Sequence, residues 1–232
     1  MNEYERLALD AFCELYPHKA NDPILFTVVF SNRHNDHGGN IKYRRTPFSS
    51  EISFHLSNSW KSLSPDLVKG LMQSLLLRLF KKRLTPQVTR TLSTDLYDTF
   101  LKKLGDYAPV TKSDPVLVES FKRINAQYFD NLMEQPNLVF GDETVRKLGH
   151  YHYPSDTIMI ASTLKERTDL IDYVMHHEML HKKHKFYTKN GKSFHHHSAF
   201  RRDEQKYANA ALMEKELSAY VAKKRWSLSR IF

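Results

Sequence analysis

Cysteine is nearly absent from this chain of 232 residues, which contains a single one, Cys13. One cysteine excludes an internal disulfide and any zinc site built from several thiolates. Glycine and proline are also scarce, at seven and nine residues, so the composition is not that of a disordered chain. We expect Cys13 to be a small buried residue of a protein in a reducing compartment and therefore predict a cytoplasmic location.

Long hydrophobic runs are missing too. The most apolar stretch, residues 71–80, is interrupted by Gln73, Ser74 and Arg78, so we predict no membrane-spanning segment and no membrane partner. The first residues do not begin a basic-then-apolar signal sequence. Since 41% of the chain is nevertheless hydrophobic and 12% aromatic, it can bury the core of one large domain or two small ones.

Acidic residues are outnumbered, 26 against 35 lysines and arginines, which gives a formal net charge of +9. This balance favours an anionic partner, of which nucleic acid is the commonest. A basic surface that is only solvated by water gives the same composition, so charge alone leaves both interpretations open. The sequence does not predict an oligomeric state.

Hydrophobic periodicity predicts the same order of elements in both halves of the chain. In the first half we expect a helix to about residue 16, strands at 24–30, 41–43 and 51–56, and helices from Pro65, capped by Ser64, and over 94–104. In the second half we expect a helix over 115–132, strands at 138–140, from 148 and at 157–161, a helix capped by Thr168, and a last helix over 198–224. Residues 103–115 contain glycine and prolines and are typical of a linker, so we predict domains at 1–108 and 109–232.

The recurrence extends to individual residues. Asp66–Met72 (D-L-V-K-G-L-M) lies over Asp169–Met175 (D-L-I-D-Y-V-M) without a gap. We therefore predict an internal duplication of about 100 residues. At the metal-motif positions described next, the first copy carries Ser74, Leu75 and Arg78, so we expect it to bind no metal. Two helices that follow strands also share such a start by chance, and this alternative stays open.

The second half carries the pattern H-E-x-x-H from His177 to His181. Two histidines four residues apart on a helix share one face, so both imidazoles can bind one ion. Glu178 lies beside the first ligand, where its carboxylate can take a proton from an attacking water without binding the metal. The pattern predicts a Zn2+ site with two histidine ligands and Glu178 as general base. Zinc is favoured because imidazoles and an open position suit it, although other divalent ions bind such sites.

A catalytic zinc site needs a third protein ligand and keeps one position open. His184 lies one turn beyond the motif, where a continuing helix carries it away from the ion. Glu204 and the run His195-His196-His197 are richer sources of the third ligand. The residues alone leave this choice open.

Several motifs of the second half occur in one order: F-K-R-I-N-A-Q-Y-F at 121–129, L-G-H-Y at 148–151, I-M-I at 158–160, H-H-E-M-L-H at 176–181 and H-H-S-A-F at 196–200. In these motifs, residues 115–207 resemble the SprT-like metallopeptidases, which include the Spartan group. The resemblance implies an α+β, zincin-like fold with a small mixed sheet and an active-site helix. In that family the third histidine stands four residues before a phenylalanine, which selects His196 before Phe200. His197 replaces the small residue usual at the next position, so a register with His197 as ligand stays open.

The motif and the resemblance together predict a zinc metalloendopeptidase in which His177, His181 and His196 hold Zn2+ and Glu178 is the general base. The resemblance further implies DNA-bound proteins as substrates, so a protein or peptide and a nucleic acid are the expected partners. The sequence offers three candidates for stabilising the oxyanion: Tyr151, Tyr207 and Arg201.

Two other functions compete with this prediction. One is a non-catalytic nucleic-acid-binding protein with a structural zinc site. Such a site is closed by four protein ligands and has no use for a carboxylate such as Glu178 beside the ion. The other is a zinc hydrolase whose substrate is not a peptide.

Overall fold

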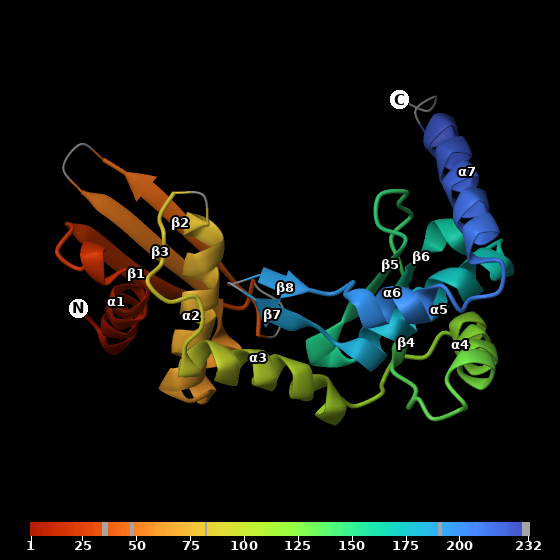
Figure 1. Cartoon of the computed structure of the whole chain (residues 1–232), viewed down its shortest axis with the longest axis horizontal. Coiled ribbons are helices and arrows are strands. Elements are labelled where there is room, and N and C mark those ends of the chain that lie inside the picture. The colour runs from red at the N-terminus through yellow and green to blue at the C-terminus, as the bar shows by residue number, and fades with distance from the viewer. Residues whose placement is uncertain (34–36, 47–48, 82, 190–191, 229–232) are drawn as a thin grey trace. The chain divides into compact units, whose positions relative to one another are not determined.

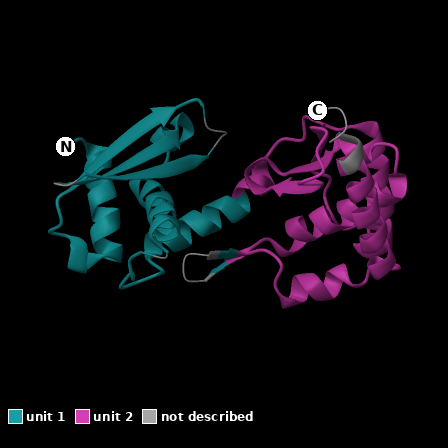
Figure 2. Cartoon of the chain, turned by 90° about the horizontal axis from the view of Figure 1, so that it is seen from above, with its two compact units in different colours: residues 1–103, 188–193 teal, residues 104–187, 194–232 magenta. Residues whose placement is uncertain are grey.

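The computed structural model describes residues 1–33, 37–46, 49–81, 83–189 and 192–228. The chain forms two compact α+β units, of which unit 1 comprises residues 1–103 with 188–193, and unit 2 residues 104–187 with 194–232 (Figure 2). The domain boundary between residues 108 and 109 stays a prediction. No helix in the described part of the chain is long and apolar enough to cross a membrane.

Unit 1 contains a three-stranded sheet against which two of its helices, α1 and α2, pack (Figure 1). Its elements are α1 (Glu3–Leu15), β1 (Ile24–Ser31), β2 (Gly39–Arg45), β3 (Ser50–Ser57), α2 (Pro65–Phe80) and α3 (Leu92–Leu104). In the sheet order β1-β3-β2, the central strand β3 runs parallel to β1 and antiparallel to β2. Helix α1 packs against β1, and α2 packs against β2 and α1.

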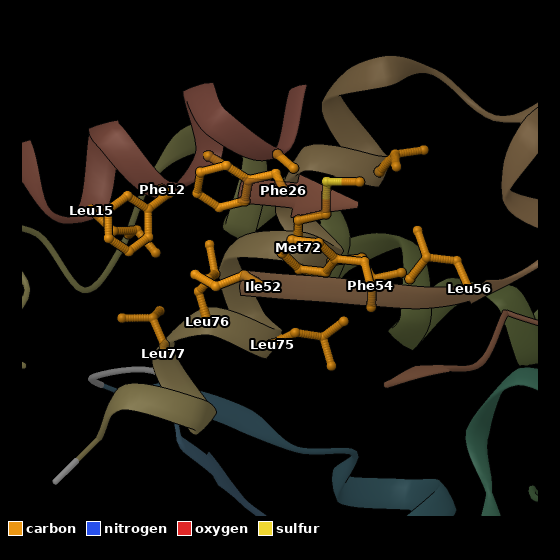
Figure 3. Packing of buried hydrophobic residues seen from close by; sticks show 14 of the residues in the cluster. Phe12, Leu15, Phe26, Ile52, Phe54, Leu56, Met72, Leu75, Leu76 and Leu77 are labelled. Atoms are coloured by element: carbon orange, nitrogen blue, oxygen red, sulfur yellow. The ribbon is translucent and has the colours of Figure 1, made fainter. Parts of the chain in front are cut away.

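The core of unit 1 follows from the period of its strands. In β3, Ile52, Phe54 and Leu56 are fully buried, and the residues between them are only partly buried, as expected for a strand with one face toward helices. Their side chains meet apolar residues of α1 and α2 (Figure 3). Helix α1 begins with a capping box in which Asn2 and Glu5 each accept the other's backbone N–H.

Unit 2 repeats this arrangement. Its elements are α4 (Pro115–Tyr128), β4 (Asn137–Gly141), β5 (Gly149–His152), β6 (Thr157–Ala161), α5 (Thr168–His184), α6 (Ser198–Glu204) and α7 (Ala210–Leu228). The strand order is β4-β6-β5, with β6 parallel to β4 and antiparallel to β5. Between α5 and α6 in the sequence, the short strands β7 (Tyr187–Lys189) and β8 (Lys192–Phe194) pair with each other, and their residues 188–193 belong to unit 1.

Two predicted helices were too long. The helix predicted over 115–132 ends at Tyr128, because Asp130 and Asn131 adopt left-handed conformations with φ of 53° and 58°. The single helix predicted over 198–224 is two helices, α6 and α7. The intervening segment ends at Asn209, which also has a positive φ of 58°.

One of the two predicted N-terminal caps needs correction. Thr168 is the first helical residue of α5, and the cap position is held by Arg167, which makes no side-chain capping bond. The Arg167 guanidinium instead binds Asp169 in the first turn. Ser64 does occupy the cap position of α2, but its side chain makes no capping hydrogen bond.

Candidate metal centre

Helix α5 is held in unit 2 by an apolar face that packs against α4, α6 and the strands β5 and β6. The buried apolar residues of that face are Leu170, Ile171, Val174, Met175, Met179 and Leu180. Their spacing fixes the rotation of the helix about its axis. This rotation leaves His177 and His181 partly buried on one side, one turn apart.

Three imidazoles converge at this side of α5. The ligand atoms offered by His177, His181 and His196 all lie within 4.8 Å of one another. In the described part of the chain, this is the one such group of three or more His, Cys, Asp or Glu side chains. The Nε2 atoms of His181 and His196 are 3.1 Å apart. Three nitrogens that share a tetrahedral zinc ion at about 2.0–2.1 Å lie about 3.3–3.4 Å from one another, so small shifts of these side chains would fit the group to a metal.

The protonation states of His181 and His196 suit metal binding, because a metal needs the lone pair of a neutral imidazole. Burial and the neighbouring imidazole of His177 lower the pKa of His181 to about 3. Burial likewise lowers the pKa of His196. Both rings therefore offer lone pairs at neutral pH.

Glu204 orients the first histidine. Its Oε1 lies 2.7 Å from Nδ1 of His177, so Nδ1 donates the hydrogen bond and Nε2 remains for the cluster. Burial lowers the pKa of His177, but the bond to Glu204 and the negative charges of Glu178 and Glu204 together outweigh it, so the net shift is upward. The same bond lowers the pKa of Glu204, which stays ionised. Glu204, which the sequence offered as a candidate third ligand, thus binds the far side of the His177 ring in this structure.

Phe200 forms the wall behind the cluster. Its ring is fully buried, and its centroid lies 5.2, 4.8 and 4.7 Å from those of His177, His181 and His196. Nδ1 of His181 is buried without a hydrogen-bond partner among the described residues, so packing against Phe200 helps to orient this ring.

The other histidines considered as third ligands have different positions. His195 Nδ1 lies 3.2 Å from the hydroxyl of Tyr153. His197 caps α6, where its Nδ1 accepts the backbone N–H of Phe200 at 3.4 Å. His184 bonds Asp203 through Nε2 at 2.9 Å. The structure brings His196 into the cluster, and its role as metal ligand stays a prediction.

Glu178 is buried against strand β5. Its side chain accepts the backbone N–H of Tyr151, and the residue is only 5% exposed. Burial raises the pKa of Glu178 to about 7, although His177, the bond from Tyr151 and the charge of Lys147 lower it. Gly149 leaves room for the carboxylate of Glu178, since a Cβ at position 149 would lie 2.4 Å from Oε1 of Glu178.

Tyr153 was missed by the sequence reasoning. It follows β5 in a 3-10 turn, its hydroxyl contacts His195, and its ring packs against Phe186 at 5.2 Å. Burial and the nearby charge of Glu178 raise its pKa, so the phenol stays protonated and can donate a hydrogen bond. Only the sequence run H-Y-H-Y-P at 150–154 could have drawn attention to it.

Two of the three oxyanion candidates from sequence have other partners. The hydroxyl of Tyr151 donates to the buried Asp156 at 2.7 Å. The ring of Tyr207 stacks on Tyr128 at 5.2 Å and contacts His176 at 5.1 Å. The third, Arg201, is exposed. His176 is a buried core residue, and burial lowers its pKa to about 4.

Comparisons with known proteins give little further information. No protein family matches the sequence, and no curated protein matches it. Among solved structures, the chain is similar to the metallopeptidase zymogen jannalysin of Methanocaldococcus jannaschii, with 19% identity and a TM-score of 0.36. The match covers 49% of this chain and 98% of that one. A TM-score of this size shows neither a common fold nor a common activity.

Proposed function

We propose that the protein is a zinc-dependent metallopeptidase. The observation that carries this proposal is the convergence of His177, His181 and His196 beside a buried carboxylate that is not part of the cluster. Three imidazoles leave one position of a tetrahedral ion open, as in a catalytic site. A structural zinc site needs neither that open position nor Glu178.

The side chains around the cluster supply acid–base catalysis and positioning. A zinc ion, when bound, would activate a water molecule and polarise the carbonyl of the peptide bond. Glu178 accepts the proton of the attacking water and delivers it to the leaving amine. Tyr153 donates a hydrogen bond to the carbonyl oxygen, where negative charge develops in the transition state. Glu204 holds the ring of His177 in the orientation needed for binding.

Strand β5 is the proposed binding site for the substrate backbone. It lies at the edge of the sheet, and the N–H of Tyr151 on this strand donates to Glu178. The free edge of β5 therefore faces the proposed general base. A peptide that adds to this edge as a strand brings its scissile bond near Glu178.

The finer assignment to a zincin-like fold of the SprT-like type rests on the sequence motifs. So does the expectation that DNA-associated proteins are substrates. The assignment is supported by the position of His196, the histidine selected by the resemblance, whose Nε2 lies 3.1 Å from Nε2 of His181. A cytoplasmic location likewise stays a prediction.

We infer further that unit 1 is a copy of the metallopeptidase fold without the metal site. In both units a helix, three strands and another helix follow one another along the chain. The third strand is central in each sheet and runs parallel to the first strand and antiparallel to the second. The second strand of each unit along the chain, β2 or β5, begins with a glycine that lies against the helix following the sheet, α2 or α5. A Cβ at Gly39 would meet Leu71, and one at Gly149 would meet Val174, which aligns with Leu71.

The peptidase proposal is tested by the cleavage of unfolded casein and of a mixed peptide library, with wild type and Glu178→Gln. Gln keeps the size of the side chain and removes its basicity. We expect cleavage by the wild type, its loss with a zinc chelator and its return with zinc. Glu178→Gln should be slower by about 10²–10⁴. If the zinc-loaded wild type cleaves neither, or if both proteins cleave equally, the proposal is wrong and a structural zinc site takes its place.

A further inference from the structure

Unit 1 contains a cavity that the metal centre does not use. It has a volume of about 570 Å³ and lies among the C-terminal end of α1, the turn after it, strand β2 and the end of α2. Its apolar lining comes from Phe12, Ile24, Phe80 and Leu84. The volume falls in the range of small-molecule sites.

Cations dominate the charge of this cavity. Lys19, Arg45 and Arg83 line it together with one carboxylate, Asp22. That carboxylate is 3.1 Å from Lys19 and neutralises it. Among the described residues, neither arginine forms an ion pair with a carboxylate. Two guanidinium groups are therefore left to bind an anion, and their planar donors match a phosphate group.

An aromatic ring stands beside these arginines. Tyr43 is half-buried, packs edge-on against Phe80 at 5.5 Å and is covered by the Arg83 guanidinium at 5.9 Å from its centroid. Its hydroxyl shares a hydrogen bond with Ser50 at 3.1 Å. Phenol rings and guanidinium planes are the groups on which nucleobases stack.

The corresponding cavity of unit 2 differs in its charges. It has a volume of about 470 Å³ and lies among the ends of α4 and α5 and strand β5. Three lysines line it, but each is bound to a carboxylate: Lys182 to Asp156, Lys183 to Asp203 and Lys185 to Asp106. The cavity of unit 2 is thus neutralised by the protein itself, whereas that of unit 1 keeps an excess of positive charge.

We propose that the cavity of unit 1 binds a nucleotide, either free or as one residue of a single-stranded nucleic acid. The phosphate binds Arg45 and Arg83, and the base stacks against Tyr43 over the apolar lining. This site lies outside the proposed metal centre and does not depend on its chemistry. A peptidase that proves inactive could still bind nucleotides here, and the reverse also holds.

The test uses the full chain and three probes: AMP, inorganic phosphate and a fluorescein-labelled oligo(dT). Calorimetry measures the first two and fluorescence anisotropy the third, at several salt concentrations. In the double variant Arg45→Gln/Arg83→Gln, we expect the affinity to fall at least about tenfold, because charge-assisted hydrogen bonds are lost. For the oligonucleotide, the slope of log affinity against log salt concentration should fall by about 0.7, since the site holds one phosphate and each neutralised phosphate of a single strand contributes about 0.7.

The matched control is Arg44→Gln/Arg78→Gln, which removes the same charge from exposed positions that do not line the cavity. Arg44 is adjacent to Arg45 but points to the other face of β2. We expect less than about a twofold loss, as for surface charges outside the site. AMP binding indicates a free nucleotide, and binding of oligo(dT) alone indicates a single strand; both support the proposal. An equal loss in the control, phosphate binding as tight as AMP, or no binding of any probe would overturn it.

Discussion

Helices α2 and α5 occupy the same place in their units and differ in what they carry. When Asp66 is aligned with Asp169, five buried apolar positions coincide along the two helices: Val68 with Ile171, Leu71 with Val174, Met72 with Met175, Leu76 with Met179, and Leu77 with Leu180. At the position of Glu178, both units also bury the side chain, but its chemistry differs. Leu75 of unit 1 is 2% exposed, and the aligned Glu178 is 5% exposed.

The difference between Leu75 and Glu178 distinguishes what the fold needs at this position from what the chemistry needs. A carboxylate in a buried position costs free energy that an apolar side chain does not. Unit 1 shows that leucine fills the position within the same fold. Glu178 is therefore not needed for packing, and its presence beside the histidine cluster favours a catalytic role.

The largest predicted effect on activity comes from replacing Glu178 of α5 by leucine, the residue at the aligned position 75 of α2. Glu178→Leu should abolish general base catalysis and lower kcat by at least about 10²–10⁴. The melting temperature should stay the same or rise, because a buried carboxylate is replaced by an apolar group. Peptidase assays and thermal unfolding measure the two effects. A variant that unfolds, or that stays active, would show that the alignment of the two helices is misleading.

The second prediction compares two tyrosines near strand β5. Tyr153→Phe removes the hydroxyl that we propose donates a hydrogen bond to the carbonyl oxygen of the substrate. It should lower kcat by about 10²–10³ with little change in KM. Tyr151→Phe breaks the bond to Asp156 and should destabilise the fold by about 1 kcal/mol without lowering kcat. Steady-state kinetics and urea unfolding distinguish them. Equal kcat values for both variants would remove Tyr153 from the mechanism.

The two aligned glycines give a third comparison. In Gly149→Ala, the added Cβ meets Oε1 of Glu178 at 2.4 Å and Val174 at 2.6 Å, so we expect the general base to move and kcat to fall about 10²-fold. In Gly39→Ala, it meets Leu56 at 2.8 Å, which costs about 1–3 kcal/mol of stability and leaves the activity unchanged. Activity lost equally in both variants would mean that the glycines act on the fold alone.

The smallest predicted effect concerns pH. Burial raises the pKa of Asp203, but hydrogen bonds from Lys183, Lys206 and His184 outweigh it and hold that pKa well below its usual value. The folded state then binds fewer protons than the unfolded state. This stabilisation is complete above about pH 4 and is lost as the pH falls through the folded-state pKa. Asp203→Asn should reduce the fall in the free energy of unfolding, measured by urea titration, as the pH is lowered below about 4. The same fall in the variant and the wild type would contradict this.

Sequence patterns predicted the parts of the site that lie close together in the chain. The spacing of His177 and His181 fixes their common face, and strand periodicity placed both sheets. Tyr153 and Gly149 could not be predicted, because their importance arises from the approach of β5 to α5. The role of Glu204 was also beyond the sequence, since its bond to His177 depends on the short helix α6 and the break after it.

The zinc content of four purified proteins tests the central claim most directly: wild type, Glu178→Gln, His196→Ala and His195→Ala. After dialysis against a fixed concentration of free zinc, we expect about one zinc ion in the wild type, in Glu178→Gln and in His195→Ala, and its loss in His196→Ala. Zinc retained by His196→Ala, or lost from Glu178→Gln, would contradict a three-histidine centre with Glu178 outside it.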